Sequence, residues 1–173
     1  MSESKDRDHA PPVGPPTVMS MVAPVSGQVV AMADVPDPVF AQEIVGPGLA
    51  IEPLAEGAVD GVVVAPVSGT VASLFPHAFA LQTPDSRTVL VHLGIDTVTL
   101  KGAGFEVLVA VGEEVVVGQH VLSWDPSAVS AAGLATVCPV VALQGDAAQV
   151  TALVAPGATV RRGDPLLEWR SPS

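Results

Sequence analysis

The hexapeptide VAPVSG at residues 22–27 recurs unchanged at residues 64–69, an offset of 42 residues. A second pair of segments, residues 108–124 and 153–169, matches at an offset of 45, and Trp124 and Trp169 end the two copies. Each copy consists of short apolar runs separated by glycines, which is typical of strands joined by turns. Because one such unit is too small to enclose a core, we expect paired copies to pack about a pseudo-dyad.

The composition also favours strands over helices. Hydrophobic residues make up 49% of the 173 residues but aromatic residues only 3%, so the core has to be built from Val, Ala and Leu. Val favours pleated strands, and 16 Gly and 17 Pro supply turns. We therefore predict an all-β sandwich or barrel of short strands. Short helical turns are expected at residues 38–44 and 126–134, the second capped by Asp125.

The N-terminal segment, the apolar runs and the cysteine content indicate where the protein resides. Residues 1–17 are polar and then Pro-rich, which predicts a disordered tail before a folded domain at 18–173. The longest apolar run, residues 44–51, is much shorter than the ~20 residues that a membrane-spanning helix needs. The N-terminus lacks the apolar core of a signal peptide, and the lone Cys138 cannot form an internal disulfide. These features predict a cytoplasmic protein.

The formal net charge of −11 narrows the classes of partner. Only seven residues are Lys or Arg, and they form no cluster of the kind that binds nucleic acid. The same charge disfavours an anionic membrane. It favours a basic protein partner drawn in by electrostatic attraction.

Two histidines stand out in the β-prone half of the chain. His92 ends an apolar run just before Gly94, and His77 lies fifteen residues upstream, with a hairpin turn expected at residues 84–86. Two imidazoles at one place suggest a metal site or a phosphoryl relay, and a core histidine is the plain alternative. Zinc usually takes three or four protein ligands; Asp96 could be a third, but no H-x-H or H-E-x-x-H is present. A relay, in which one imidazole attacks phosphorus and the other donates a hydrogen bond, fits better.

Two other kinds of site compete with the relay. Lys101 is the only lysine beyond residue 5, which raises the alternative of a lipoyl- or biotinyl-type carrier. Such attachment lysines sit in Met-Lys-Met or Asp-Lys-Ala hairpins, and neither is present, so a solvated turn lysine is favoured. A zinc metallopeptidase would need an H-x-H and a secretion signal, and both are missing.

Segments spread along the folded region carry a family resemblance. They are residues 23–27, 34–40, 44–48, 76–79 and 92–105. In order and spacing the chain resembles the glucose-type enzyme IIA domains of the bacterial phosphoenolpyruvate-dependent sugar phosphotransferase system. The resemblance implies an antiparallel β sandwich with internal pseudo-repeats, of the duplicated hybrid motif type. It also implies an EIIA type-1 domain. Because the chain stands free, we expect its IIB and IIC partners to lie on another polypeptide.

The resemblance implies a mechanism and partners. His92 would be phosphorylated on Nε2, the tele nitrogen, by the phosphocarrier protein HPr, and His77 would stabilise the phosphoryl group. The group would then pass to a cysteine on the IIB domain of a sugar permease, with no obligatory cofactor. Docking would use an apolar face with an acidic rim, made by Val39, Phe40, Val45, Gly46, Val98, Asp37 and Asp96.

Some relatives also have regulatory partners, namely sugar kinases and permeases. In one such type of complex a partner carboxylate completes a zinc site, which here would use His77 and His92.

Three departures from the family pattern matter. Phe75 replaces a hydroxyl residue near His77, and the role of that hydroxyl would be absent or would fall to Thr97 or Thr83. Leu90 replaces an aromatic residue that some relatives have two positions before the active histidine. Some relatives begin with a membrane-associating amphipathic segment, whereas this tail is Pro-rich and charged, so we expect no membrane anchoring through it. Phe75 leaves open the alternative of a regulatory docking module that has lost phosphotransfer.

Overall fold

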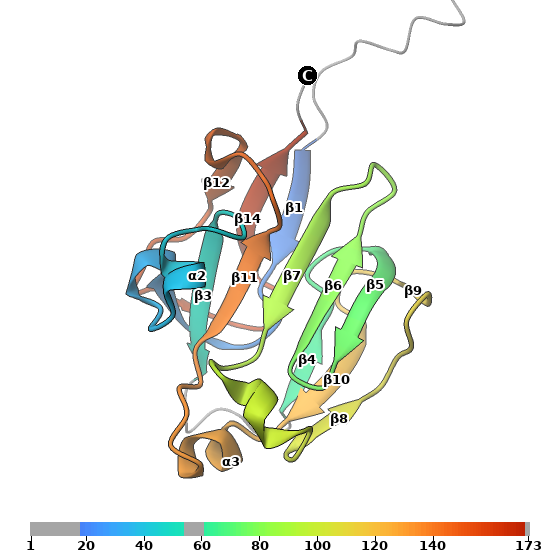
Figure 1. Ribbon diagram of the computed structural model, residues 1–173. Coiled ribbons are helices and arrows are strands. Elements are labelled where there is room, and N and C mark those ends of the chain that lie inside the picture. Colours follow the sequence, from blue (N-terminus) through green and yellow to red (C-terminus); the bar gives the residue numbers. More distant parts are fainter. Residues whose placement is uncertain (1–17, 54–60, 172–173) are drawn as a thin grey trace, which may run out of the picture.

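Antiparallel strands dominate the computed structural model, which describes residues 18–53 and 61–171 (Figure 1). The α-helices and 3₁₀ helices among these residues are short. The elements run in the order β1 Val18–Val22, β2 Gly27–Ala31, η1 Met32–Asp34, α2 Pro38–Ala41, β3 Gly48–Pro53, β4 Val62–Val64, β5 Gly69–Phe75, β6 Ala78–Gln82, β7 Thr88–His92, η2 Thr97–Leu100, β8 Phe105–Val107, β9 Glu114–Val115, β10 His120–Trp124, α3 Pro126–Ala131, β11 Cys138–Ala142, η3 Ala147–Gln149, β12 Val150–Ala152, β13 Thr159–Val160 and β14 Pro165–Arg170.

The strands form one large sheet and two small ones. The eight-stranded sheet has the order β13-β2-β3-β11-β7-β6-β5-β9, and the three-stranded sheets have the orders β1-β14-β12 and β4-β10-β8. In Figure 1 the small sheets lie behind the large one, which gives a sandwich of short strands. The predicted all-β antiparallel fold is therefore confirmed.

The two VAPVSG segments exchange hydrogen bonds, as a pseudo-dyad requires. The Val22 N–H donates to the Pro66 carbonyl oxygen, and the Val64 N–H donates to the Pro24 carbonyl oxygen, each at 3.0 Å. The pairing of β1 with β14 is repeated by the pairing of β4 with β10. Each copy of the hexapeptide thus begins at the end of a strand, β1 or β4. That strand pairs with the last strand of one copy of the second repeat.

Serine hydroxyls repeat the same pattern. The Ser26 Oγ accepts a hydrogen bond from the Arg162 N–H, and the Ser68 Oγ accepts one from the Val117 N–H, both at 2.8 Å. These serines occupy equivalent positions of the hexapeptide, and their donors are 45 residues apart, the offset of the second repeat. The internal repeats are therefore structural repeats, as the sequence predicts.

Two clusters of buried side chains hold the molecule together. The larger one joins all three sheets, is rich in Val and Leu, and includes Trp124 and Trp169. The smaller one lies under α2, where Phe40 and Ile95 pack against Ala50 and Val141 of β3 and β11. Because strand side chains alternate between faces, β3 and β11 contribute to both clusters. The smaller cluster is the one that reaches the histidines.

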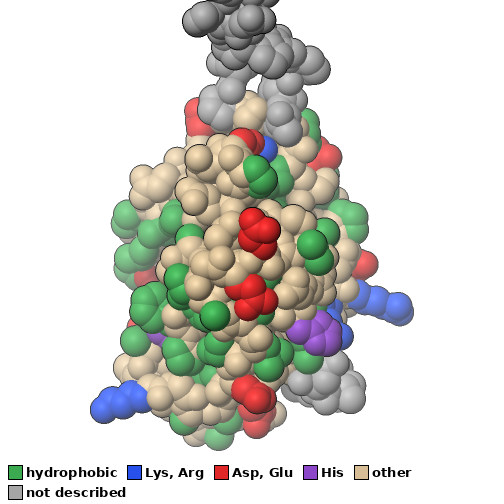
Figure 2. Space-filling view, turned by 90° about the vertical axis from the view of Figure 1, so that its right-hand side faces the viewer, with side chains coloured by type: hydrophobic (Ala, Val, Ile, Leu, Met, Phe, Trp, Pro, Cys, Tyr) green, Lys and Arg blue, Asp and Glu red, His purple; other side chains and the backbone are tan. Residues whose placement is uncertain are grey.

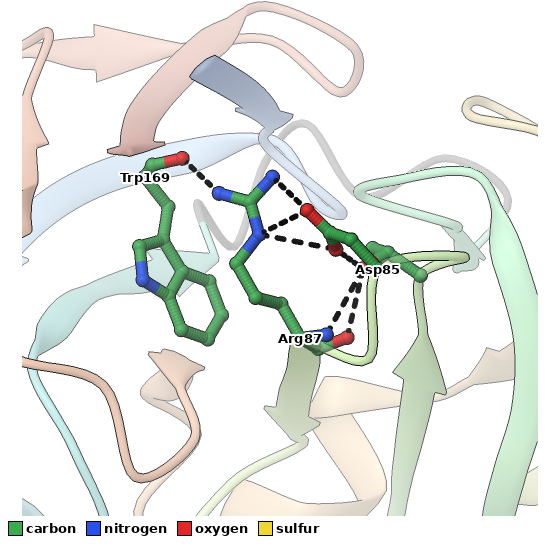
Figure 3. A network of polar contacts seen from close by, with 4 residues as sticks. Asp85, Arg87 and Trp169 are labelled. Carbon is green, nitrogen blue, oxygen red and sulfur yellow. Dashed lines mark hydrogen bonds and ion pairs between the residues drawn. The ribbon is translucent and has the colours of Figure 1, made fainter. Parts of the chain in front are cut away.

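A buried arginine ties the β6–β7 turn to the C-terminal strand (Figure 3). The Arg87 guanidinium forms an ion pair with Asp85 at 2.8 Å and donates a hydrogen bond to the Trp169 carbonyl oxygen. Its Cζ also lies 5.6 Å from the centroid of the Trp169 ring. This turn, which the sequence places at residues 84–86, is at the end of the hairpin remote from His77 and His92.

The helical turns lie close to where the sequence puts them. The Asp37 and Asp125 carboxylates cap α2 and α3 by accepting hydrogen bonds from Val39 N–H and Ser127 N–H. Pro38 and Pro126 then occupy the first turns, where a missing N–H costs nothing. β1 begins at Val18, and the disordered tail predicted for residues 1–17 lies outside the described residues.

The surface carries the acidic character of the composition. On the face shown in Figure 2, acidic side chains stand near the centre and most basic side chains lie toward the edges.

The longest α-helix of the described part, α3, has six residues, and none of the described helices has the length and hydropathy to cross a membrane.

Candidate functional site

His77 and His92 meet at one end of the large sheet. β5 and β6 are joined by a two-residue turn, Pro76 and His77, and β7 ends at His92, which pairs with Ala78 at the start of β6. The Leu93 N–H donates to the His77 carbonyl oxygen at 2.8 Å, which closes this corner. In Figure 1 the β5–β6 turn and the end of β7 both lie at the lower end of the sheet.

The two imidazoles are in ring contact. Their centroids lie 5.2 Å apart in an edge-to-face arrangement. Phe40 flanks His92 with a centroid separation of 5.3 Å, and Phe75 flanks His77 at 5.9 Å. The pairing that the sequence suggests is therefore present, with a phenyl ring next to each imidazole.

A backbone carbonyl sets the tautomer of His92. The His92 Nδ1 lies 2.6 Å from the Gly94 carbonyl oxygen. Because a carbonyl oxygen can only accept, Nδ1 carries the proton. In the neutral ring Nε2 then holds the free lone pair, which makes it the nucleophilic nitrogen.

Gly94 is fixed in the conformation that this contact needs. Its φ is +76°, in the left-handed region that favours glycine, and the adjacent Ile95 N–H donates to the Ala135 carbonyl oxygen at 3.0 Å. A Cβ at position 94 would lie 2.8 Å from that carbonyl oxygen and 2.7 Å from the Thr97 methyl carbon. The turn therefore has room only for glycine.

Both histidines favour the neutral form. Burial lowers the pKa of His92, although the Gly94 carbonyl and the negative charges of Asp37 and Asp96 oppose the shift. Burial also lowers the pKa of His77, and the charge of His92 lowers it further. Around neutral pH the site therefore offers one free lone pair at His92 and one N–H at His77 that can donate.

Neither threonine considered as a stand-in for the family hydroxyl is free beside His77. The Thr97 Oγ1 is buried and donates to the Leu93 carbonyl oxygen at 2.7 Å, so it supports the loop after His92. Thr83 lies at the opposite end of the hairpin, where its hydroxyl contacts Asp85 and the Arg87 backbone. Position 75 itself carries only a phenyl ring.

The predicted docking residues divide into exposed and supporting ones. Val39 and Val98 are exposed, and Val45 is half-buried. Phe40 and Gly46 are buried and support this face from beneath. The use of these residues by a partner stays a prediction.

Two further apolar side chains, Ile44 and Phe75, are exposed but are not among the predicted docking residues. Ile44 is 63% exposed and Phe75 is 55% exposed. Ile44 falls within a matched segment next to Val45, and that position was a usable signal. For Phe75 the sequence signals only the missing hydroxyl. We call the exposed side chains Val39, Ile44, Phe75 and Val98 the apolar face.

The two predicted rim carboxylates flank His92. Asp37 caps α2, with its Oδ1 2.9 Å from the Val39 nitrogen, and its charge acts on His92. Asp96 is exposed, adopts a left-handed φ of +62° and follows Gly94 by two residues. The site is thus an apolar face with negative charge at its edge.

The geometry gives little support to three other kinds of site: a metal site, a reactive cysteine and a carrier lysine. Among residues 18–53 and 61–171, no three His, Cys, Asp or Glu side chains are grouped closely enough to hold a metal ion. A zinc ion bound by His77 and His92 stays a prediction, and it needs a carboxylate from a partner. Burial raises the pKa of the Cys138 thiol, which suits an inert core residue. Lys101 ends the 3₁₀ helix η2, whereas a carrier lysine would lie at a hairpin tip.

Comparison with known proteins identifies the family. The family model for the phosphoenolpyruvate-dependent sugar phosphotransferase system, EIIA 1, matches residues 19–148. The chain belongs to this family. The EIIA domain also resembles a solved structure of glucose permease IIA from Mycoplasma capricolum, with a TM-score of 0.77 and 30% sequence identity, over 88% of this chain and 96% of that one.

Curated relatives include stand-alone and fused proteins. The glucose-specific EIIA component of Halalkalibacterium halodurans is 43% identical over 69% of this chain and 67% of its own length. The N-acetylglucosamine-specific EIICBA component of Klebsiella pneumoniae is 40% identical over 88% of this chain. The glucose-specific EIICBA component of Streptococcus pneumoniae is 49% identical over 70% of this chain. The matched regions make up only 23% and 16% of the two fused relatives.

Proposed function

We propose that this EIIA domain is a phosphoryl carrier of a sugar phosphotransferase system. It would accept a phosphoryl group from phosphorylated HPr on His92 and pass it to a cysteine of a IIB domain during sugar uptake. The observation that carries the proposal is the 2.6 Å contact between His92 Nδ1 and the Gly94 carbonyl oxygen, because it leaves the Nε2 lone pair free.

The transfer step follows from this tautomer. The N–P bond forms at Nε2 while the bond between phosphorus and the donor breaks, and Nδ1 keeps its proton on the Gly94 carbonyl. His77 supplies an N–H to a phosphoryl oxygen, which is supported by the 5.2 Å separation of the two rings. Charge-assisted hydrogen bonds of this kind contribute about 1.5–3 kcal/mol.

The surroundings of the histidines suit a basic protein partner. The apolar face would dock against HPr, with Asp37 and Asp96 opposite its arginines. The overall charge of −11 would attract the same partner from a distance. The relatives named above point to glucose or N-acetylglucosamine as the transported sugar. A cytoplasmic location stays a prediction. Regulatory binding to sugar kinases or permeases stays a prediction.

Intact mass tests the proposal directly. The protein is incubated with phosphoenolpyruvate, enzyme I and HPr, as wild type and as His92→Gln, His77→Gln and His120→Gln. We expect one acid-labile phosphoryl group on wild type, on His77→Gln and on His120→Gln, and none on His92→Gln. His120 is an exposed histidine at the start of β10 and serves as the matched control. An unmodified wild type would leave the docking-module alternative in place.

A further inference from the structure

Four aromatic rings are linked in sequence through the site. The centroid separations are 5.3 Å for Phe40 and His92, 5.2 Å for His92 and His77, and 5.9 Å for His77 and Phe75. The two ends differ in their exposure: Phe40 is 7% exposed, and Phe75 is 55% exposed. His92 is therefore held against the core, while His77 has a phenyl neighbour on the solvent side.

The backbone around His77 is well fixed, but the backbone alone does not fix its side chain. Phe75 pairs with Ala78 across the turn, and Pro76 holds one turn residue near a φ of about −65°. The Pro76 ring lies beside Gly102, where an added Cβ would be 3.5 Å from Pro76 Cγ. The half-buried His77 imidazole can still adopt several side-chain rotamers. A neighbouring ring selects among them, because aromatic pairs have preferred geometries.

Phe75 differs in this respect from the other exposed members of the apolar face. Ile44 and Val98 are as exposed as Phe75, at 63% and 61%, but only Phe75 brings a ring against an imidazole. It is also the residue that directly precedes the turn carrying His77. Its position thus suits a role in orienting His77 as well as contact with a partner.

We propose that Phe75 is a positioning residue for His77. Its ring holds the His77 imidazole toward His92, so that the His77 N–H meets the phosphoryl group as it arrives at Nε2. The inference rests on the proposed function, because the orientation matters only if His92 carries a phosphoryl group. The rigid Pro76 turn and the Phe75 ring together place the donor without help from a hydroxyl at position 75.

Steady-state phosphorylation of the full-length protein by phosphorylated HPr tests the assignment. The variants are Phe75→Ala, Phe75→Tyr, and Ile44→Ala as a matched loss of exposed apolar surface. We expect Phe75→Ala to lower the rate at saturating HPr about threefold to tenfold, the range set by aromatic pair energies. Phe75→Tyr should restore that rate because it keeps the ring. Ile44→Ala should mainly raise the HPr concentration that gives half the maximal rate.

Two results would overturn the inference. One is a Phe75→Ala protein that behaves like Ile44→Ala, with an unchanged saturating rate, which would make Phe75 a docking residue only. The other is the absence of nuclear Overhauser contacts between the Phe75 and His77 ring protons in wild type. A wild type that accepts no phosphoryl group would instead overturn the proposed function, so the two failures are distinguishable.

Discussion

The His92 Nδ1–H donates a 2.6 Å hydrogen bond to the carbonyl oxygen of Gly94, two residues further along the chain. This contact couples the conformation of a tight turn to the choice of nucleophilic nitrogen. The turn is held in place by the Ala135 carbonyl, which accepts from the Ile95 N–H. A change at Gly94 should therefore affect stability and phosphoryl transfer together.

Gly94→Ala should destabilise the protein and slow phosphorylation of His92. The left-handed φ costs an alanine about 1–2 kcal/mol, and the clash with Ala135 and Thr97 adds about 1–3 kcal/mol. Gly112→Ala is the matched control, since Gly112 has a φ of +90° with nothing within 4 Å of an added Cβ. Urea denaturation and the rate of phosphorylation should show the larger loss for Gly94→Ala. Equal losses in the two variants would contradict the close packing described at Gly94.

The pH dependence of phosphorylation should reflect the lowered pKa of His92. Only the neutral ring has the Nε2 lone pair, so the rate falls when the pH drops through the His92 pKa. Because burial places that pKa below the ordinary value of 6.5, the protein should keep more than half of its reactivity at pH 6.5. Nuclear magnetic resonance titration of the His92 ring in the presence of a chelator, assigned with His92→Gln, measures the midpoint. A midpoint above 6.5 would be inconsistent with this site.

Asp37→Asn should lower the His92 pKa further. The substitution removes a negative charge that raises this pKa, while asparagine still caps α2 as well as aspartate does. Asp125→Asn makes the same change at the cap of α3, so its His92 midpoint should match that of wild type. A similar midpoint in all three proteins would show that Asp37 does not act on His92.

Arg87→Ala should cost about 1–3 kcal/mol of stability, since it leaves the Trp169 carbonyl oxygen without its side-chain donor. Asp85→Asn should cost less than about 1 kcal/mol, because the Asp85 side chain is 41% exposed and its ion pair is screened. Arg161→Ala, an exposed change of the same charge, should stay within about 0.5 kcal/mol of wild type. Urea denaturation ranks the three, and an Arg87→Ala protein as stable as Arg161→Ala would contradict the cross-link.

Local patterns in the sequence were enough for the fold and for the pairing of the histidines. The repeated hexapeptide predicts the pseudo-dyad because identical segments make identical turns, and the Val22 and Val64 hydrogen bonds realise it. The fifteen-residue spacing predicts the meeting of His77 and His92 because a hairpin with a turn near Asp85 returns the chain to its start.

Contacts between segments that are far apart in the sequence cannot be predicted from local patterns. The ring contact between Phe75 and His77 depends on a two-residue turn, and the sequence does not give the length of that turn. The tie between Arg87 and Trp169 joins residues 82 positions apart, and no local pattern signals it. Phe40 and Gly46 match the family's docking face, but their burial follows from packing under α2 and against β11.

The pairing of β1 with β14 has a consequence for the newly made chain. Among the described strands, β14 is the only neighbour of β1 in its sheet, and it spans Pro165–Arg170. During translation β1 therefore has no strand partner in this sheet until residues 165–170 have left the ribosome. Such long-range pairing slows folding and exposes apolar strands in the meantime. Nascent chains stalled shortly before residue 165 should bind chaperones that chains extended well past residue 170 no longer need.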